Sequence, residues 1–216
     1  MRLVVFDLDG TLIDSRQDLA DSANALIAER GGTPLPVDRV TAMVGEGAAL
    51  LVRRALSAAG LDPDVDTALP RFLELYDERL LVHTALYPGT REMLDAIRAK
   101  ATLAVLTNKP QHHTERVLDG LQLSSYFHSI VGGDTRFGRK PDPAGLRHVI
   151  STAGSDAAST VLVGDSAIDL RTARAAGVRI CLVRYGFGFP LAVPELAGGE
   201  WVADTPSDIP RLIISA

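Results

Sequence analysis

Two aspartates separated by one residue are the first side chains in this sequence that could do chemistry. Asp7 and Asp9 follow the apolar residues 3–6, and Gly10 comes directly after them. Glycine permits a sharp turn, so both carboxylates can face one point. Carboxylates placed together can act as nucleophile, as general acid and base, or as ligands of a hard cation. An Asp-x-Asp-Gly sequence is also typical of an ordinary polar loop, so the interpretation depends on what accompanies it.

A second polar group follows the apolar residues 103–106. Thr107 and Asn108 stand just before a predicted helix, with Pro110 at a plausible first helical position. A hydroxyl and free backbone N–H groups at such a place could bind an anion. A simple helix cap at Thr107 is the alternative explanation.

A second pair of carboxylates follows the apolar residues 161–164. Asp165 comes directly after this run, and Asp169 lies about one helical turn further on. The pair could hold a hard divalent cation together with the first two carboxylates. Helix capping by Asp165 or Ser166, with Asp169 favoured by the positive end of the helix, would also account for these residues.

Lys140 is the fourth candidate, in a segment flanked by Pro141 and Pro143. The chain has three lysines against nineteen arginines, so a lysine in this rigid segment is notable. A solvated surface lysine is the alternative.

The apolar runs that precede these residues have the pattern of buried strands. Residues 3–6, 103–106, 129–131 and 161–164 are short, continuously apolar and rich in β-branched side chains, which predicts strands covered on both faces. Helices are predicted between or after them, over 90–100, 110–120, 141–153 and 166–176, the last ended by Gly177. This alternation predicts an α/β fold with a doubly wound parallel sheet.

The predicted sheet brings the candidate residues together. Ligands of open α/β sheets bind outside the carboxyl ends of the strands, so Asp7, Thr107 and Asp165 should converge there. Each feature has an ordinary explanation alone. Their order along the chain and their common edge favour a single site.

Residues 15–82 interrupt the alternation of strands and helices. They contain no strand-like run, and the periodicity predicts helices over 15–30, 38–44, 46–59 and 65–82. We therefore predict a core domain formed by residues 1–14 and 83–216, with an inserted helical cap domain formed by residues 15–82. The cap has seven arginines against eleven acidic residues, and it holds −4 of the total charge of −5.

Composition excludes several classes of protein. The chain has 216 residues, 46% hydrophobic and 23% charged, which is typical of a folded globular protein. A net charge of −5 argues against nucleic-acid binding. No apolar stretch approaches the roughly 20 residues of a membrane span, and Asp7 and Asp9 interrupt the only apolar run near the N-terminus. We expect no membrane association and a cytoplasmic location.

For the remaining residues that could take part in chemistry, we predict structural roles. Cys181, inside the apolar residues 178–183, is expected to be a core residue. The five histidines form no metal-ligand pattern. Residues 187–199 are predicted to form a long surface loop, with Phe187, Phe189 and Trp201 packed beneath it.

Taken together, the four motifs resemble those of the haloacid dehalogenase superfamily. Residues 7–11 match its first motif, Thr107 its second, Lys140 its third and residues 164–169 its fourth. The resemblance spans the chain and implies a Rossmann-like core with an inserted cap. Within the superfamily, residues 9–15, 44–47, 107–110 and 132–135 most resemble the phosphoglycolate phosphatase branch.

The resemblance implies a phosphatase mechanism and assigns residues to it. Asp7 would attack phosphorus to form an aspartyl-phosphate, and Asp9 would be the general acid and base. Mg²⁺ would be bound by Asp7, the Asp9 backbone carbonyl and Asp165. The resemblance assigns further residues to phosphate binding (Gly10, Thr11, Thr107, Asn108 and Lys140), to supporting positions behind the metal (Ser166 and Asp169) and to substrate binding from the cap (Gly45, Glu46 and Gly47).

Several functions remain open within this interpretation. A haloalkanoic acid dehalogenase does not need the proton donor Asp9, and a phosphonatase needs a cap lysine that residues 15–82 lack. A β-phosphoglucomutase-like mutase, a pyrophosphatase and a broad sugar phosphatase share the motifs. A non-catalytic binding module is the alternative from another class. We expect a small phosphorylated metabolite as substrate, and a monomer or homodimer.

Overall fold

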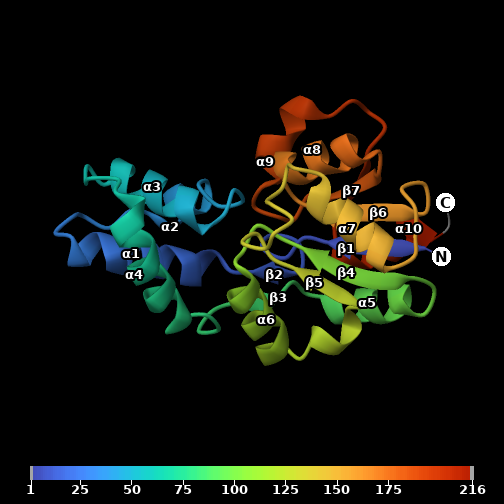
Figure 1. Ribbon diagram of the computed structural model, residues 1–216, viewed down its shortest axis with the longest axis horizontal. Helices are drawn as coiled ribbons and strands as arrows, with labels where there is room; N and C mark the ends of the chain where they lie inside the picture. Colours follow the sequence, from blue (N-terminus) through green and yellow to red (C-terminus); the bar gives the residue numbers. More distant parts are fainter. Residues whose placement is uncertain (1, 215–216) are drawn as a thin grey trace.

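A six-stranded parallel sheet forms the centre of the computed structural model, which describes residues 2–214 (Figure 1). In spatial order its strands are β5 (Ser129–Val131), β4 (Thr102–Leu106), β1 (Leu3–Phe6), β6 (Thr160–Gly164), β7 (Arg179–Val183) and β8 (Trp201–Ala203). The chain adds strands on both sides of β1, so the predicted doubly wound sheet is confirmed. The strands β7 and β8 were not among the four predicted strands, although residues 178–183 were noted as an apolar run.

Helices cover both faces of this sheet. Val4 and Phe6 of β1 point into one apolar cluster, which includes residues of α5 (Thr90–Arg98), α6 (Gln111–Gly120) and α10 (Ile209–Ile214). Leu3 and Val5 point into a second cluster with α7 (Ala144–Thr152), α8 (Ala167–Ala176) and α9 (Phe189–Ala192). Burial on both faces explains why the strands are continuously apolar. Cys181 is a buried free cysteine of β7, as predicted.

Residues 15–82 carry four helices, as the periodicity predicted. They are α1 (Arg16–Glu29), α2 (Val37–Thr41), α3 (Ala48–Ala58) and α4 (Val65–Asp77), and they lie beside the sheet as a helical insert (Figure 1). A two-stranded antiparallel pair, β2 (Ile13–Asp14) with β3 (Ala85–Leu86), joins the chain segments that enter and leave the insert. This pair was not predicted. The domain boundaries at 14/15 and 82/83 stay a prediction.

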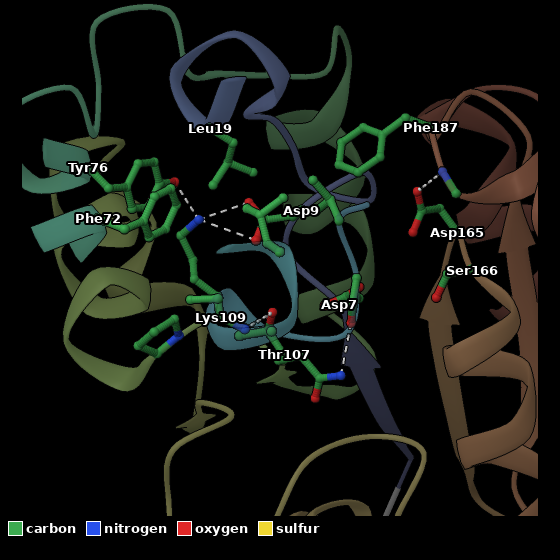
Figure 2. Close-up of a pocket in the computed structure, with 18 of the residues that line it drawn as sticks. Asp7, Asp9, Leu19, Phe72, Tyr76, Thr107, Lys109, Asp165, Ser166 and Phe187 are labelled. Atoms are coloured by element: carbon green, nitrogen blue, oxygen red, sulfur yellow. Dashed lines mark hydrogen bonds and ion pairs between the residues drawn. The ribbon is translucent and has the colours of Figure 1, made fainter. Parts of the chain in front are cut away.

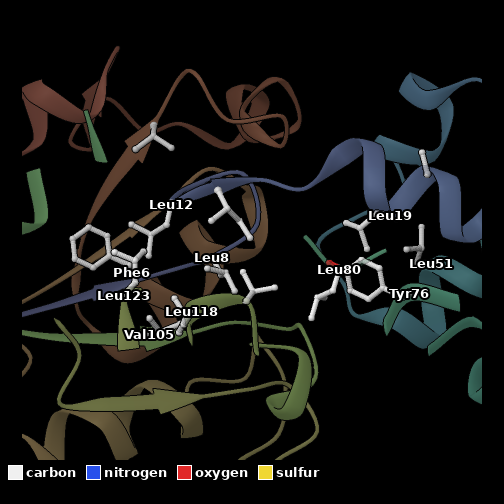
Figure 3. Close-up of a cluster of buried hydrophobic side chains, with 14 of the residues drawn as sticks. Phe6, Leu8, Leu12, Leu19, Leu51, Tyr76, Leu80, Val105, Leu118 and Leu123 are labelled. Atoms are coloured by element: carbon white, nitrogen blue, oxygen red, sulfur yellow. The ribbon is translucent and has the colours of Figure 1, made fainter. Parts of the chain in front are cut away.

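One apolar cluster continues from the sheet into the helical insert. Figure 3 shows Phe6 and Leu8 on the sheet side, with Leu19, Leu51 and Tyr76 on the insert side. These side chains are each 6% exposed or less. Their shared burial favours the arrangement in which the insert lies against the edge of the sheet.

A buried carboxylate on the first helix of the insert accepts hydrogen bonds from the residues at which the chain leaves the insert. Asp18 of α1 is fully buried and accepts hydrogen bonds from the His83 N–H (2.9 and 3.1 Å), the Thr84 N–H (2.8 Å) and the Thr84 hydroxyl (2.7 Å). Helix α4 was predicted to run to residue 82, but it ends at Asp77. The residues after it form the turns that bring the donors to Asp18.

Other helix limits differ from the predictions for local reasons. Helix α3 begins at Ala48 rather than residue 46, because Gly45 and Gly47 have φ angles of +118° and +92°, which a right-handed helix does not use. Gly177 adopts the left-handed conformation that ends α8, as predicted.

The predicted loop over residues 187–199 contains regular structure. It forms α9 and the 3₁₀ helix η2 (Val193–Glu195), and Phe189 of α9 is buried against the second cluster. Further 3₁₀ helices are η1 (Ser124–Tyr126) and η3 (Pro206–Asp208). Among the described residues, no helix combines the length and apolar character that crossing a membrane requires.

Candidate active site

A pocket lies where the carboxyl ends of the strands meet the helical insert. Asp7 follows β1, Thr107 follows β4 and Asp165 follows β6, and all three line this pocket (Figure 2). The predicted convergence of these residues is confirmed. The insert supplies a largely apolar opposite wall, formed by Leu19, Val44, Ala48, Leu51, Phe72, Leu73 and Tyr76.

Three buried carboxylates and one lysine form the polar centre of the site. Oxygens of Asp7, Asp165 and Asp169 lie within 4.8 Å of one another. The Lys140 ammonium lies 2.8 Å from an Asp7 oxygen and 2.6 Å from an Asp169 oxygen. With these groups ionised, three negative charges and one positive charge leave a net charge of −2 (1 − 3) in a site nearly closed to water. Such a site favours a divalent cation with oxygen ligands.

Asp169 is held by the protein on both of its oxygens. Oδ1 accepts from Lys140, and Oδ2 accepts from the backbone N–H (3.1 Å) and hydroxyl (2.6 Å) of Ser166. Ser166 is the N-cap of α8, and its hydroxyl accepts in turn from the Asp169 N–H. One capping box therefore starts the helix and orients the lysine.

Burial weakens the acidity of two carboxyl groups in this cluster. It raises the pKa of Asp7 to about 6, although the charge of Lys140 opposes the rise. The pKa of Asp165 is raised well above its ordinary value by burial and then by the charges of Asp169 and Asp7. Burial lowers the pKa of Lys140, but the two carboxylates outweigh burial and raise it, so this side chain is a cation. Without a further cation, the site favours carboxyl groups that keep a proton.

Asp9 faces the same pocket in a different environment. Its Oδ1 accepts a hydrogen bond of 2.6 Å from the Ser15 hydroxyl, and both of its carboxylate oxygens lie within 3.2 Å of the Lys109 ammonium. The Asp9 carboxylate thus stands apart from the cluster around Lys140.

Asn108 connects the insert to the third motif. Its side-chain N–H₂ donates to the backbone carbonyls of Gly45 and Lys140, both at 2.9 Å, and its Oδ1 accepts from the Lys140 N–H at 2.8 Å. The side chain is therefore occupied by backbone partners. Thr107 accepts a hydrogen bond of 3.3 Å from the Lys109 N–H through its hydroxyl oxygen.

Close packing around the carboxylates requires glycine at several positions, among them Gly10 and Gly164. Gly10 has a φ of +84°, and a Cβ there would lie 2.1 Å from an Asp165 oxygen. A Cβ at Gly164 would lie 2.3 Å from the carboxyl carbon of Asp169. Both contacts are far shorter than van der Waals distance, so the strand ends approach this closely only because these residues have no side chain.

Comparison with known proteins identifies the family. The family model described as "Haloacid dehalogenase-like hydrolase" matches residues 4–183. The chain belongs to this family. It is 39% identical over 216 residues to a plasmid-encoded phosphoglycolate phosphatase of Cupriavidus necator, covering 99% of this chain and 93% of the relative. It is 44% identical over 194 residues to a phosphoglycolate phosphatase of Rhodospirillum rubrum, covering 86% of this chain and 80% of the relative.

A solved structure agrees with the sequence comparisons. The crystal structure of a predicted phosphoglycolate phosphatase from Haemophilus somnus has a TM-score of 0.91 and 30% identity, covering 100% of this chain and 98% of that chain. The present chain is accordingly a haloacid dehalogenase-like phosphatase, and its buried cluster of Asp7, Asp165 and Asp169 is typical of the magnesium site of this family.

The predicted site residues divide into two groups by location. Eight line the pocket: Asp7, Asp9, Gly45, Gly47, Thr107, Asn108, Asp165 and Ser166. Lys140 and Asp169 lie just behind Asp7, and Gly10 packs against Asp165. Thr11 is fully buried and lies outside the pocket lining. Glu46 also lies outside the lining and forms an ion pair with Arg54.

Sequence reasoning missed several residues of this haloacid dehalogenase-like site. Lys109, Phe72 and Tyr76 line the pocket, as does Phe187, which had been predicted only to pack under a loop. Lys109 is one of the chain's three lysines and lies two residues after Thr107, and this was the signal that could have identified it.

Proposed function

We propose that this protein is a Mg²⁺-dependent phosphatase that hydrolyses 2-phosphoglycolate to glycolate and phosphate. The convergence of Asp7, Asp165 and Asp169 on Lys140, beside the pocket-lining Asp9, carries the chemical part of this proposal. The choice of substrate is supported by the relatives from C. necator and R. rubrum, which are named phosphoglycolate phosphatases and align with most of the chain.

Asp7 is the proposed nucleophile. One of its carboxylate oxygens attacks phosphorus in line, a P–O bond forms, and the bond from phosphorus to the glycolate oxygen breaks. Asp9 gives its proton to that leaving oxygen. In the second half of the reaction Asp9 takes a proton from water, whose oxygen attacks phosphorus and releases Asp7. The two carboxylates suit different roles because only Asp7 belongs to the cluster around Lys140.

The phosphoryl oxygens are held by groups at the strand ends. Thr107, the Asn108 N–H and the Lys140 ammonium are the proposed donors, and the Asn108 side chain keeps the backbone of Lys140 in place. Asp7, Asp165 and the Asp9 backbone carbonyl would hold Mg²⁺, whose positive charge would offset the repulsion between the carboxylate nucleophile and the phosphate. Asp169 orients Lys140, since both of its oxygens already have protein partners.

The insert is the proposed cap and the source of specificity. Helix α3 begins at the pocket, where Gly47 and Ala48 belong to the lining. The first N–H groups of a helix have no partners within it and attract negative charge, so they suit the carboxylate of a small leaving group. Arg54 is paired with Glu46, and Arg53 is exposed. Neither arginine lines the pocket.

A panel of phosphorylated substrates tests the proposal. Phosphate release is measured with Mg²⁺ for 2-phosphoglycolate, hexose phosphates, pyrophosphate and p-nitrophenyl phosphate, and we expect the highest kcat/KM for 2-phosphoglycolate. Preference for a hexose phosphate would indicate a sugar phosphatase, and conversion of β-glucose 1-phosphate to glucose 6-phosphate a mutase. Preference for pyrophosphate would indicate a pyrophosphatase. Inactivity across substrates and metals would favour a binding module.

A further inference from the structure

Lys109 links Asp9 to the helical insert. Its ammonium donates to the two carboxylate oxygens of Asp9, at 3.0 and 3.2 Å, and to the hydroxyl oxygen of Tyr76 on α4, at 2.5 Å (Figure 2). The ammonium also lies 4.6 Å from the centroid of the Tyr76 ring. The Lys109 side chain is only 2% exposed, so these groups take the place of water around its charge.

Tyr76 presents its hydroxyl from a fixed position. Its ring stacks on Phe72, with centroids 6.0 Å apart, and on His113, with centroids 5.5 Å apart. Phe72 belongs to α4 and His113 to α6, so the tyrosine is held between the insert and the core. Burial raises the pKa of Tyr76 to about 12, and the group is a neutral hydroxyl.

Both supports of Asp9 depend on the insert. The Ser15 hydroxyl, which donates to Asp9 at 2.6 Å, lies at the N-cap position of α1. Lys109 belongs to the core loop between β4 and α6, and its contact with Tyr76 reaches across the pocket to α4. The Asp9 carboxylate therefore has one partner at the start of the insert, Ser15, and a second partner, Lys109, that itself contacts the insert through Tyr76.

We propose that Lys109 and Tyr76 are positioning residues for Asp9, and that they make leaving-group protonation depend on the place of helix α4. The inference rests on the proposed role of Asp9 as general acid and base. An acid must lie within hydrogen-bond reach of the leaving oxygen, and two hydrogen bonds to one ammonium fix the rotation of the Asp9 carboxylate. When α4 moves away from the core, Lys109 loses its hydrogen bond to the Tyr76 hydroxyl. The Asp9 carboxylate is then held less firmly in one rotation.

Two aryl phosphates of nearly equal size isolate this effect. Phenyl phosphate has a poor leaving group that needs protonation, and p-nitrophenyl phosphate has a good one that needs little. Tyr76→Phe keeps the ring and removes only the hydroxyl. We expect it to lower kcat for phenyl phosphate about tenfold and for p-nitrophenyl phosphate less than about twofold, with little change in KM.

Lys109→Met is the stronger variant, and the chain supplies matched controls. We expect a loss of about 10²-fold in kcat for phenyl phosphate and a much smaller loss for p-nitrophenyl phosphate. Lys100→Met changes an exposed lysine, and Tyr126→Phe removes a hydroxyl that donates to Asp95 outside the pocket. Both controls should behave as wild type. If thermal unfolding shows that Lys109→Met does not fold, the difference between the two substrates is measured with Tyr76→Phe alone.

The Asp9→Asn background shows whether the effect passes through Asp9. Adding Tyr76→Phe or Lys109→Met to Asp9→Asn should change kcat for either aryl phosphate by less than about twofold, because the group they position is gone. Equal losses for the two substrates, or losses that persist in Asp9→Asn, overturn the inference while leaving the phosphatase proposal intact. A wild-type protein that releases no phosphate with Mg²⁺ overturns both.

Discussion

The ammonium of Lys140 lies 2.6 Å from the carboxylate of Asp169, and neither side chain is more than 2% exposed. The same ammonium lies 2.8 Å from Asp7, the proposed nucleophile. Asp169 thus determines where the one cation of the cluster sits. A lysine in this position offsets the repulsion between Asp7 and Asp165, and in the proposed mechanism it also holds a phosphoryl oxygen, so its loss should affect both folding and turnover.

Replacing Lys140 by methionine tests this relationship. The variant keeps the length of the side chain and removes its charge, leaving three buried carboxyl groups without their cation. We expect kcat/KM for p-nitrophenyl phosphate to fall by about 10²- to 10³-fold. Lys100→Met, at an exposed position, is the matched control. Activity within tenfold of wild type would contradict the role of Lys140.

Replacing Asp7 by asparagine should separate activity from stability. The amide has nearly the same shape but cannot attack phosphorus, so we expect a loss of about 10⁴-fold or more in kcat. The free energy of unfolding in urea should not fall, since a neutral amide avoids the burial penalty that raises the pKa of Asp7 to about 6. If the variant retains turnover, Asp7 is not the nucleophile. If the variant does not fold, Asp7 has a structural role.

The pKa of Asp7 predicts how Mg²⁺ stabilisation varies with pH. Its folded value of about 6 lies above its ordinary value of 3.8, so its contribution to stability is complete below about 3.8 and is lost as the pH rises through about 6. Asp165 shifts in the same direction. The metal-free site therefore contributes least to stability at neutral pH, where the buried carboxyl groups are ionised. A bound cation would offset their charge there.

Thermal unfolding with and without Mg²⁺ checks this prediction. The rise in Tm on adding Mg²⁺ should be larger at pH about 7.5 than at pH about 5, because protons compete with the metal at the lower pH. At a Mg²⁺ concentration of about 100 Kd, the stabilisation should approach about 2.7 kcal/mol. Asp165→Asn is the control and should lose most of this rise. An equal rise at both pH values would argue against Asp7 and Asp165 as ligands.

Asp18 should be important for stability although it lies outside the pocket lining. Asparagine at this position would present an N–H₂ group to donors that now share a carboxylate, so we expect Asp18→Asn to lower the free energy of unfolding by about 3 kcal/mol. Asp21→Asn, on the same helix, changes the carboxylate that accepts one exposed hydrogen bond from Gln17 into an amide and should cost little. Urea unfolding of the two variants gives the comparison.

The sheet and the main site residues were predictable because their signals are local. Each buried strand is a short apolar run, and parallel strands bring their polar ends to one edge, which is enough to place Asp7, Thr107 and Asp165 together. Contacts between elements have no such signal. Lys109 contacts Tyr76 because of where α4 lies against the core, and no sequence periodicity encodes that placement.

Buried polar residues of the insert were missed for a related reason. Asp18 lies among polar residues at the start of a helix, where a solvated aspartate has the same sequence pattern. Its burial depends on the return of residues 83–84 from the far end of the insert. The edge strand β8 has only three residues, and the charged residues Glu200 and Asp204 stand on either side of it.

Gly47 lies at the start of α3, the helix whose first residues line the pocket. Its φ of +92° disfavours any side chain, and a Cβ would lie 3.4 Å from the Asn108 carbonyl oxygen. Valine should therefore displace the first turn of α3 and its N–H groups. We expect Gly47→Val to lower kcat/KM for 2-phosphoglycolate about tenfold more than for p-nitrophenyl phosphate, whose aryl group needs no partner for a carboxylate.

Gly60→Val is the matched control for this variant. Gly60 also has a positive φ, +72°, but a Cβ there meets nothing within 4 Å. Both variants carry the cost of a branched side chain at a positive φ, about 1–3 kcal/mol each, so both should lower Tm. Only Gly47→Val should change the ratio of the two kcat/KM values. An equal loss on both substrates would mean that the start of α3 does not contact the glycolate carboxylate, and the choice of substrate would then have to rest on another part of the insert.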